Sequence, residues 1–142
     1  MRAFVVSFFV LGFLGVGVEI IHTAVGDHCK KRAVGIIDWT FQGHSSLWMF
    51  PIYGSLAIFF PLGYRIVSEW FLPIRACFYA AGIMIFEYCA GYVLHRYIGV
   101  RPWQYTDGWH LNGYVRLDYF PRWMIFGVFV EWFFLTFFPS LL

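Results

Sequence analysis

The stretch AFVVSFFVLGFLGVGVEIIHTAV, residues 3–25, decides the fold class, because it is an apolar run of the length that a helix needs to cross a bilayer. Three further runs of similar length follow, at about residues 46–64, 74–95 and 122–140. The apolar core of a secretory signal has only about 7–15 residues, so we expect the first run to be a mature helix. The sequence therefore predicts an all-α, polytopic membrane protein with a four-helix transmembrane bundle.

The composition predicts a single transmembrane domain over residues 1–142. Of the 142 residues, 61% are hydrophobic and only 13% are charged. A water-soluble domain of this size buries about 60–70% of the surface of its unfolded chain, so much apolar surface would stay in contact with water. The lipid bilayer is therefore the expected partner of this surface. The net charge of +2, scattered over loops, excludes nucleic acid as an expected partner.

The loops between the predicted helices differ in charge. Residues 26–45 and 96–121 connect helices at one face of the membrane, and residues 65–73 lie at the other face. The first face holds seven basic residues: Lys30, Lys31, Arg32, Arg96, Arg101, Arg116 and Arg122. The second face holds three: Arg2, Arg65 and Arg75. The positive-inside rule therefore predicts that loops 26–45 and 96–121 are cytoplasmic. The loop between helices 3 and 4 is long and aromatic, which is typical of a functional or packed segment.

One glutamate lies within each of the first, third and fourth predicted helices, at Glu19, Glu87 and Glu131. An ionisable side chain in hydrocarbon costs at least about 2.5 kcal/mol on insertion scales, so it normally faces the protein interior and has a partner. Counted from the cytoplasmic helix ends, the three glutamates lie about 9, 12 and 13.5 Å deep, and Tyr53 lies about 10 Å deep. We therefore expect a polar pocket at one depth, open toward the cytoplasmic loops.

Small residues share a helical face with each of these glutamates. Gly15 precedes Glu19 by four residues, Gly91 follows Glu87 by four, and Gly127 precedes Glu131 by four. Small residues let a neighbouring helix approach closely. We therefore expect the glutamates to lie where elements pack together.

Three carboxylates that lie close together raise one another's proton affinity, so they require either protonation or a cation. The sequence leaves an arginine of loop 96–121, a metal ion and a cationic ligand as alternatives, beside a purely structural role in helix association. Glu19 and His22 form the Glu-x-x-His pair of di-iron bundles, which need two such pairs. The di-iron interpretation therefore lacks a ligand set, and a single metal ion held by Glu19, His22, Glu87 and Glu131 is only a minor alternative. The sequence thus assigns no residue as a metal ligand and specifies no cofactor. His22 is kept as a ligand-binding candidate with the three glutamates and Tyr53.

These residues favour a transport component that binds a small cationic or protonatable species. A structural accessory subunit, with other membrane protein subunits as partners, is the first alternative. A membrane-embedded lipid-modifying enzyme, with a glutamate as general base, is the second alternative. The chain contains no phosphate loop and no Gly-x-Ser-x-Gly elbow, so enzymatic activity is less favoured than binding.

Three motifs carry a family resemblance: SLWMFPIYG at residues 46–54, RPWQYT at 101–106 and NGYVRLDY at 112–119. The chain resembles the transmembrane protein 229 family, which is related to CmpB-like membrane proteins labelled "putative ABC-transporter type IV". The resemblance implies a polytopic membrane protein and marks a set of residues: Glu19, Trp48, Tyr53, Gly54, Glu87, Gly91, Pro102, Trp103, Tyr105, Gly113, Trp123 and Glu131. It therefore adds Trp103 and Tyr105 to the ligand-binding candidates. Gln104 and Thr106 stand where the family usually has aspartate and serine.

Overall fold

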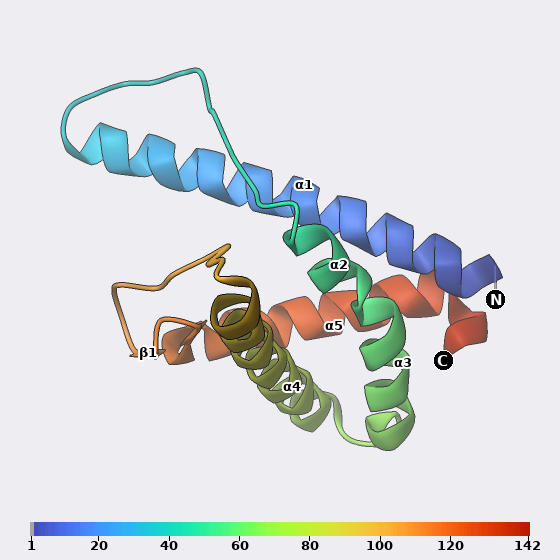
Figure 1. Cartoon of the computed structure of the whole chain (residues 1–142). Helices are drawn as coiled ribbons and strands as arrows, with labels where there is room; N and C mark the ends of the chain where they lie inside the picture. Colours follow the sequence, from blue (N-terminus) through green and yellow to red (C-terminus); the bar gives the residue numbers. More distant parts are fainter. Residues whose placement is uncertain (1) are drawn as a thin grey trace. The chain divides into compact units, whose positions relative to one another are not determined.

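The computed structural model describes residues 2–142, which form helices and one short hairpin (Figure 1). The α-helices are α1 (Arg2–Ala33), α2 (Met49–Gly54), α3 (Leu56–Val67), α4 (Leu72–Val93) and α5 (Phe120–Phe137). A π-helical turn, η1 (Leu94–Ile98), and two 3-10 turns, η2 (Leu117–Tyr119) and η3 (Pro139–Leu141), extend them. The strands are β1 (His110–Leu111) and β2 (Val115–Arg116).

Four helical stretches are long and apolar enough to cross a membrane: Arg2–Ala33, Met49–Val67, Leu72–Ile98 and Leu117–Phe137. The helical fold class and the four spans predicted from the sequence are thereby confirmed. The chain divides into two compact units, Met1–Ala57 and Ile58–Leu142. A single domain over residues 1–142 stays a prediction.

Helix α1 continues to Ala33, whereas the sequence predicted an end near residue 25. The last turn contains three basic residues, Lys30, Lys31 and Arg32. Their positive charges interact favourably with the negative end of the helix dipole, so the helix is stabilised beyond the apolar run. Gly35 terminates the helix two residues beyond Ala33, and its φ of 83° is accessible to glycine at little cost. The N–H of Gly35 donates to Arg32 O, and the N–H of Ile36 donates to Lys31 O, as in a Schellman motif.

Helices α1 and α2 pack closely in the first unit because α1 presents two glycines to α2. A Cβ atom at Gly12 would lie 2.7 Å from the ring of Phe50, and one at Gly15 would overlap the ring of Tyr53. Larger residues at either position would push the two helices apart. The close approach expected beside Glu19 is thus confirmed.

The second unit is built on the packing of α4 against α5. A Cβ atom at Gly127 of α5 would overlap the Cβ atom of Tyr79 of α4, so the two backbones are as close as a glycine allows. Phe60 of α3 stacks on Phe134 of α5, with ring centroids 5.1 Å apart. Phe134 and Val67 are completely buried, so this aromatic contact is the centre of the unit's core.

The loop predicted between residues 96 and 121 contains a β-hairpin that the sequence analysis did not predict. Leu111 pairs with Val115 and His110 with Arg116 in antiparallel register. The turn between them has positive φ at both Asn112 (53°) and Gly113 (75°), and the Tyr114 N–H donates to Leu111 O at 3.0 Å. Asn-Gly is the preferred sequence for such a type I′ turn, so the sequence did contain a signal for this hairpin.

Candidate functional site

Glu131 is the most completely buried carboxylate among the predicted site residues, with 6% of its surface exposed. Arg75 of α4 donates from Nη2 to Glu131 Oε1 at 2.7 Å and from Nε to Oε2 at 3.2 Å. The Tyr79 hydroxyl, one turn further along α4, donates to Oε2 at 2.7 Å. A bidentate guanidinium pair is the strongest geometry for this contact. The charge of Glu131 is therefore balanced inside the second unit.

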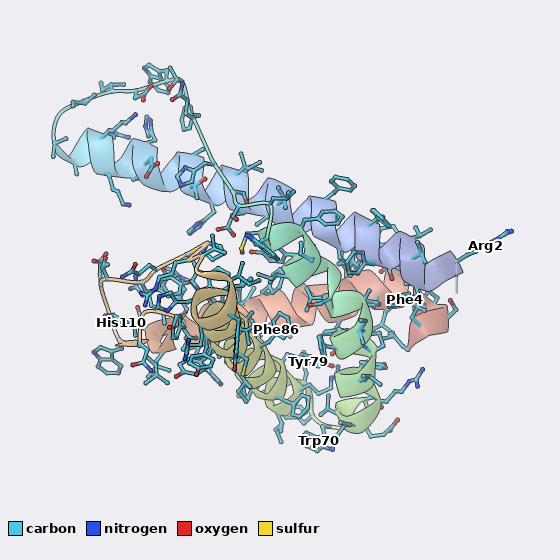
Figure 2. All side chains as sticks on the ribbon, in the orientation of Figure 1. Arg2, Phe4, Trp70, Tyr79, Phe86 and His110 are labelled. Carbon is cyan, nitrogen blue, oxygen red and sulfur yellow. The ribbon has the colours of Figure 1, made fainter. Side chains whose placement is uncertain are left out.

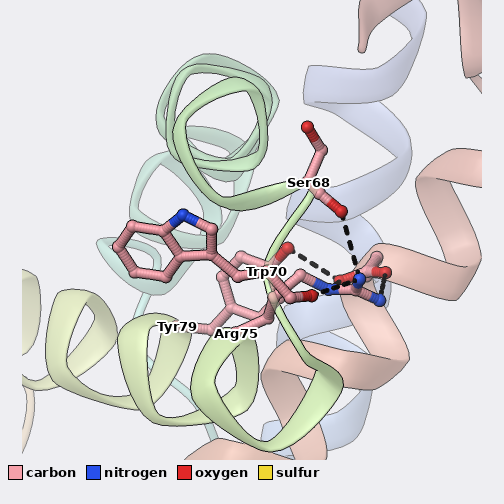
Figure 3. A network of polar contacts seen from close by, with 5 residues as sticks. Ser68, Trp70, Arg75 and Tyr79 are labelled. Atoms are coloured by element: carbon pink, nitrogen blue, oxygen red, sulfur yellow. Dashed lines mark hydrogen bonds and ion pairs between the residues drawn. The ribbon is translucent and has the colours of Figure 1, made fainter.

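Arg75 also holds the turn that joins α3 to α4 (Figure 3). Its Nη1 atom donates to the carbonyl oxygens of Ser68, at 3.2 Å, and Trp70, at 3.0 Å. The guanidinium thus connects the turn with α5 through Glu131. A buried ion pair is tolerated when further hydrogen bonds satisfy both charged groups. Here both the carboxylate of Glu131 and the guanidinium of Arg75 have several partners, so this condition is met.

The common depth predicted for Glu87 and Glu131 is wrong. Glu131 contacts Arg75 near the start of α4, and twelve residues of α4, or about 18 Å, separate Arg75 from Glu87. The depth estimate assumed that the predicted ends of the two helices, near residues 95 and 122, lie at the same level. The contact of Gly127 with Tyr79 sets a different register, in which the start of α5 lies beside the middle of α4.

Glu87 contacts the aromatic loop instead. The Tyr105 hydroxyl donates to Glu87 Oε1 at 2.7 Å, and the Tyr105 N–H donates to Gly113 O at 3.0 Å. The hairpin turn at Gly113 therefore positions the residue that contacts the carboxylate. Tyr105 and Glu87, both predicted as site residues, are brought together by the fold.

Trp103, the other aromatic candidate, packs beside the same helix. Its indole N–H donates to Tyr114 O at 2.8 Å. A Cβ atom at Gly91 would lie 3.1 Å from the Tyr114 ring and 3.2 Å from the Trp103 ring, so the small residue at 91 lets both rings sit on α4. Trp103 thus supports the loop that carries Tyr105.

The η1 turn, which continues α4, adds a polar contact to this loop. His95 Nδ1 lies 2.7 Å from the Tyr114 hydroxyl and 3.1 Å from Arg101 Nη2. A guanidinium only donates, so Nδ1 accepts and the geometry assigns the ring proton to Nε2. The aromatic loop is therefore fixed at two levels, at Glu87 on α4 and at His95 on η1.

Glu19 is half-buried in the first unit and accepts a hydrogen bond from the Tyr53 hydroxyl at 3.0 Å. Both residues were predicted as site residues, and the contact between α1 and α2 brings them together. His22 is exposed on the next turn of α1, and the contacts described for residues 2–142 include no hydrogen bond or ion pair of its side chain. Among residues 2–142, the structure thus gives a hydrogen-bond partner to Glu19 and none to the side chain of His22.

Within residues 2–142, no group of three or more His, Cys, Asp or Glu side chains could hold a metal ion. Outside the candidate spans, the hydrogen bond from Lys31, followed by those from Thr40, lowers the pKa of Asp38. This pair connects the end of α1 with the loop that follows it.

Two residues of the Glu131 network, Arg75 and Tyr79, were not predicted from the sequence as site residues. From its sequence position, Arg75 was expected at the membrane face opposite the one toward which the predicted glutamate pocket opens. The two residues are four apart and therefore share one face of α4, which was a visible signal. The cation beside Glu131 comes from α4 rather than from loop 96–121.

Four helical stretches able to cross a membrane make the chain an integral multi-pass membrane protein. More specifically, it belongs to the family described as "Putative ABC-transporter type IV", which matches residues 6–142. No solved structure matches the chain. The family match confirms the CmpB-like part of the resemblance, whereas membership of the transmembrane protein 229 family stays a prediction.

Proposed function

We propose that this protein is a membrane-embedded transport component that binds small cationic or protonatable species at Glu87 of the second unit and, separately, at Glu19 of the first unit. The observation that carries the proposal is the contact between Glu87 and Tyr105, in which an ordered loop delivers a phenol to a membrane carboxylate. The membership of a transporter-type family supports a role in transport. The excess of basic residues favours a cytoplasmic position for loops 26–45 and 96–121.

The chemistry of the two carboxylate and tyrosine pairs suits a cation. In each pair a carboxylate oxygen and a phenol oxygen lie within 3.0 Å of each other, Glu87 with Tyr105 and Glu19 with Tyr53. A bound cation takes both oxygens as ligands, and the carboxylate supplies the compensating charge. Trp103, which packs beside the Glu87 pair on α4, adds an aromatic surface on which organic cations bind well.

Glu131 has a different role in this proposal. Its charge is already matched by Arg75 through two hydrogen bonds. A second cation at this carboxylate would meet repulsion from the guanidinium. We therefore assign ligand binding to Glu87 and Glu19, and assign Glu131 to the packing of α4 on α5.

A structural subunit of a larger membrane assembly is the second candidate function. The Arg75, Glu131 and Tyr79 network favours it, because a complete internal ion pair fixes two helices without any ligand. In that case the tyrosine contacts of Glu87 and Glu19 likewise only hold the fold, and other membrane subunits are the partners.

A thermal-stability titration separates the two functions. The full chain, purified in mild detergent, is titrated with sodium, potassium and choline chlorides at constant ionic strength. A ligand at 100 times its dissociation constant stabilises the folded state by about 2.7 kcal/mol. We expect at least one of these cations to raise the unfolding temperature of the wild type, and expect Glu87→Gln and Glu19→Gln to weaken that rise.

Glu69→Gln is the matched control, because Glu69 is exposed in the turn between α3 and α4. It should keep the rise seen in the wild type. If Glu87→Gln and Glu19→Gln both respond to all three cations as the wild type does, the binding role is refuted and the structural function remains.

A further inference from the structure

An apolar groove opens on the second unit, where the hairpin and the start of α5 lie beside α4. It has a volume of about 400 Å³ and is lined by Ala81, Ile85 and Tyr88 of α4, by Leu111 and Val115 of the hairpin, and by Phe120 of α5. Ile85 is 66% exposed and Leu111 is 49% exposed, so the groove presents apolar side chains to its surroundings. Figure 2 shows the side chains gathered around the hairpin near His110.

A basic cluster lies next to the residues of this groove in the sequence. The guanidinium carbons of Arg116 and Arg122 each lie 4.3 Å from the centroid of the Tyr119 ring. Tyr119 is flanked by Leu117 and Phe120, which both line the groove. The ring that both guanidinium groups contact therefore lies between two lining residues in the sequence.

The two arginines differ in their partners. Arg116 donates from Nε and Nη2 to both carboxylate oxygens of Asp118, so its charge is balanced, and this pairing raises the pKa of Arg116. Arg122 is exposed, and no ion pair of its side chain is among those of residues 2–142. The cluster thus carries one positive charge that no acidic side chain of this part of the chain matches.

We infer that the groove and Arg122 form a binding site for an anionic phospholipid. One acyl chain lies in the groove against α4 and the hairpin, and the headgroup phosphate lies at the Arg122 guanidinium beside Tyr119. The apolar lining matches a hydrocarbon chain, and the unmatched guanidinium matches a phosphate-bearing headgroup. The site does not depend on Glu87 or Glu19, so it stands apart from the proposed transport function.

Lipid retention by the purified full chain tests this inference. Native mass spectrometry compares phosphatidylglycerol with phosphatidylcholine of identical acyl chains, and glycerol phosphate serves as a headgroup without chains. The wild type should retain phosphatidylglycerol in preference, and glycerol phosphate should not bind at the same concentration. Arg122→Gln should reduce the preference about fivefold, the factor expected for one basic residue at an anionic lipid surface.

Two further variants complete the test. Ala81→Phe fills the groove and should reduce retention of both lipids, with helix content checked by circular dichroism. Arg96→Gln removes an exposed charge of η1 that lies outside the groove, and it should behave as the wild type. An unchanged lipid preference in Arg122→Gln would overturn the inference whether or not Ala81→Phe folds. Equal binding of glycerol phosphate would also overturn it, because the acyl chain would then contribute nothing.

Discussion

Breaking the ion pair of Arg75 and Glu131 should be the most damaging single charge change in the second unit. At an effective dielectric constant of about 20, unit charges 2.7 Å apart attract each other by about 6 kcal/mol. Part of this attraction only offsets the desolvation of the two groups. Arg75→Gln leaves Glu131 buried without its cation, so we expect it to lower the free energy of unfolding by about 3–5 kcal/mol.

The double-mutant cycle isolates the pair from other effects. Glu131→Gln alone removes the negative charge and leaves the Arg75 guanidinium without its carboxylate. The double variant, Arg75→Gln with Glu131→Gln, removes both charges and leaves two neutral amides. We expect the double variant to lose less stability than Arg75→Gln alone, with a coupling energy of at least about 2 kcal/mol. Reversible unfolding by sodium dodecyl sulfate, followed by circular dichroism, measures the four free energies. Arg96→Gln is the control for loss of an exposed arginine, with an expected change within about 0.5 kcal/mol.

A wild-type free energy of unfolding in Arg75→Gln would refute this role of the ion pair. A loss in the double variant equal to the sum of the two single losses would also refute it. Tyr79→Phe provides a milder test, because it removes one hydrogen bond and leaves the ion pair intact. Hydrogen bonds between transmembrane helices contribute about 0.6 kcal/mol on average and about 1.7 kcal/mol at most. A larger loss in Tyr79→Phe than in Arg75→Gln would contradict the assignment of the charge pair as the main contact.

Three further predictions concern the first unit. Gly15→Leu should lower the free energy of unfolding by at least about 2 kcal/mol, because its side chain would overlap a tyrosine ring of α2, and a wild-type unfolding transition would contradict this packing. Gly35→Ala should lower the free energy of unfolding by about 1 kcal/mol through the positive φ alone, because nothing lies within 4 Å of a Cβ atom at this position. Gly26 is equally open but helical, so Gly26→Ala should be neutral or stabilising. Equal effects of the two changes would count against the glycine cap. The hydrogen bond from Lys31 lowers the pKa of Asp38, so the pair should stabilise the fold above the unfolded pKa of about 4 and lose this contribution as pH falls toward the folded pKa. Thermal unfolding between pH 3 and 7, compared with Asp38→Asn, checks this sign, and an identical pH dependence in the two proteins would refute it.

The sequence was sufficient for the spans because hydropathy is a local property of the chain. The runs at 46–64, 74–95 and 122–140 each correspond to a helical stretch of the structure. The glycines at 15 and 127 also indicated close packing, because only small residues permit it. The boundary of α1 was less predictable, since its last two turns are polar and are held by capping rather than by lipid.

The partners of the carboxylates could not be predicted in the same way. Glu131 meets Arg75 only because Gly127 packs on Tyr79, and this register follows from side-chain shapes on both helices. Counting residues from helix ends cannot supply that register. Glu87 meets Tyr105 because the Asn-Gly turn holds the backbone of Tyr105 through Gly113 O. In both cases the deciding contact lies between segments distant in the sequence.

Direct calorimetric titration of the purified full chain tests the central claim that Glu87, held by Tyr105, is a cation-binding carboxylate. The titrant is whichever of sodium, potassium and choline chlorides stabilises the protein most. We expect saturable binding to the wild type and to Glu69→Gln, and at least tenfold weaker binding to Glu87→Gln. Binding to Glu87→Gln with the wild-type affinity, or the lack of saturable binding to the wild type for all three salts, would contradict it.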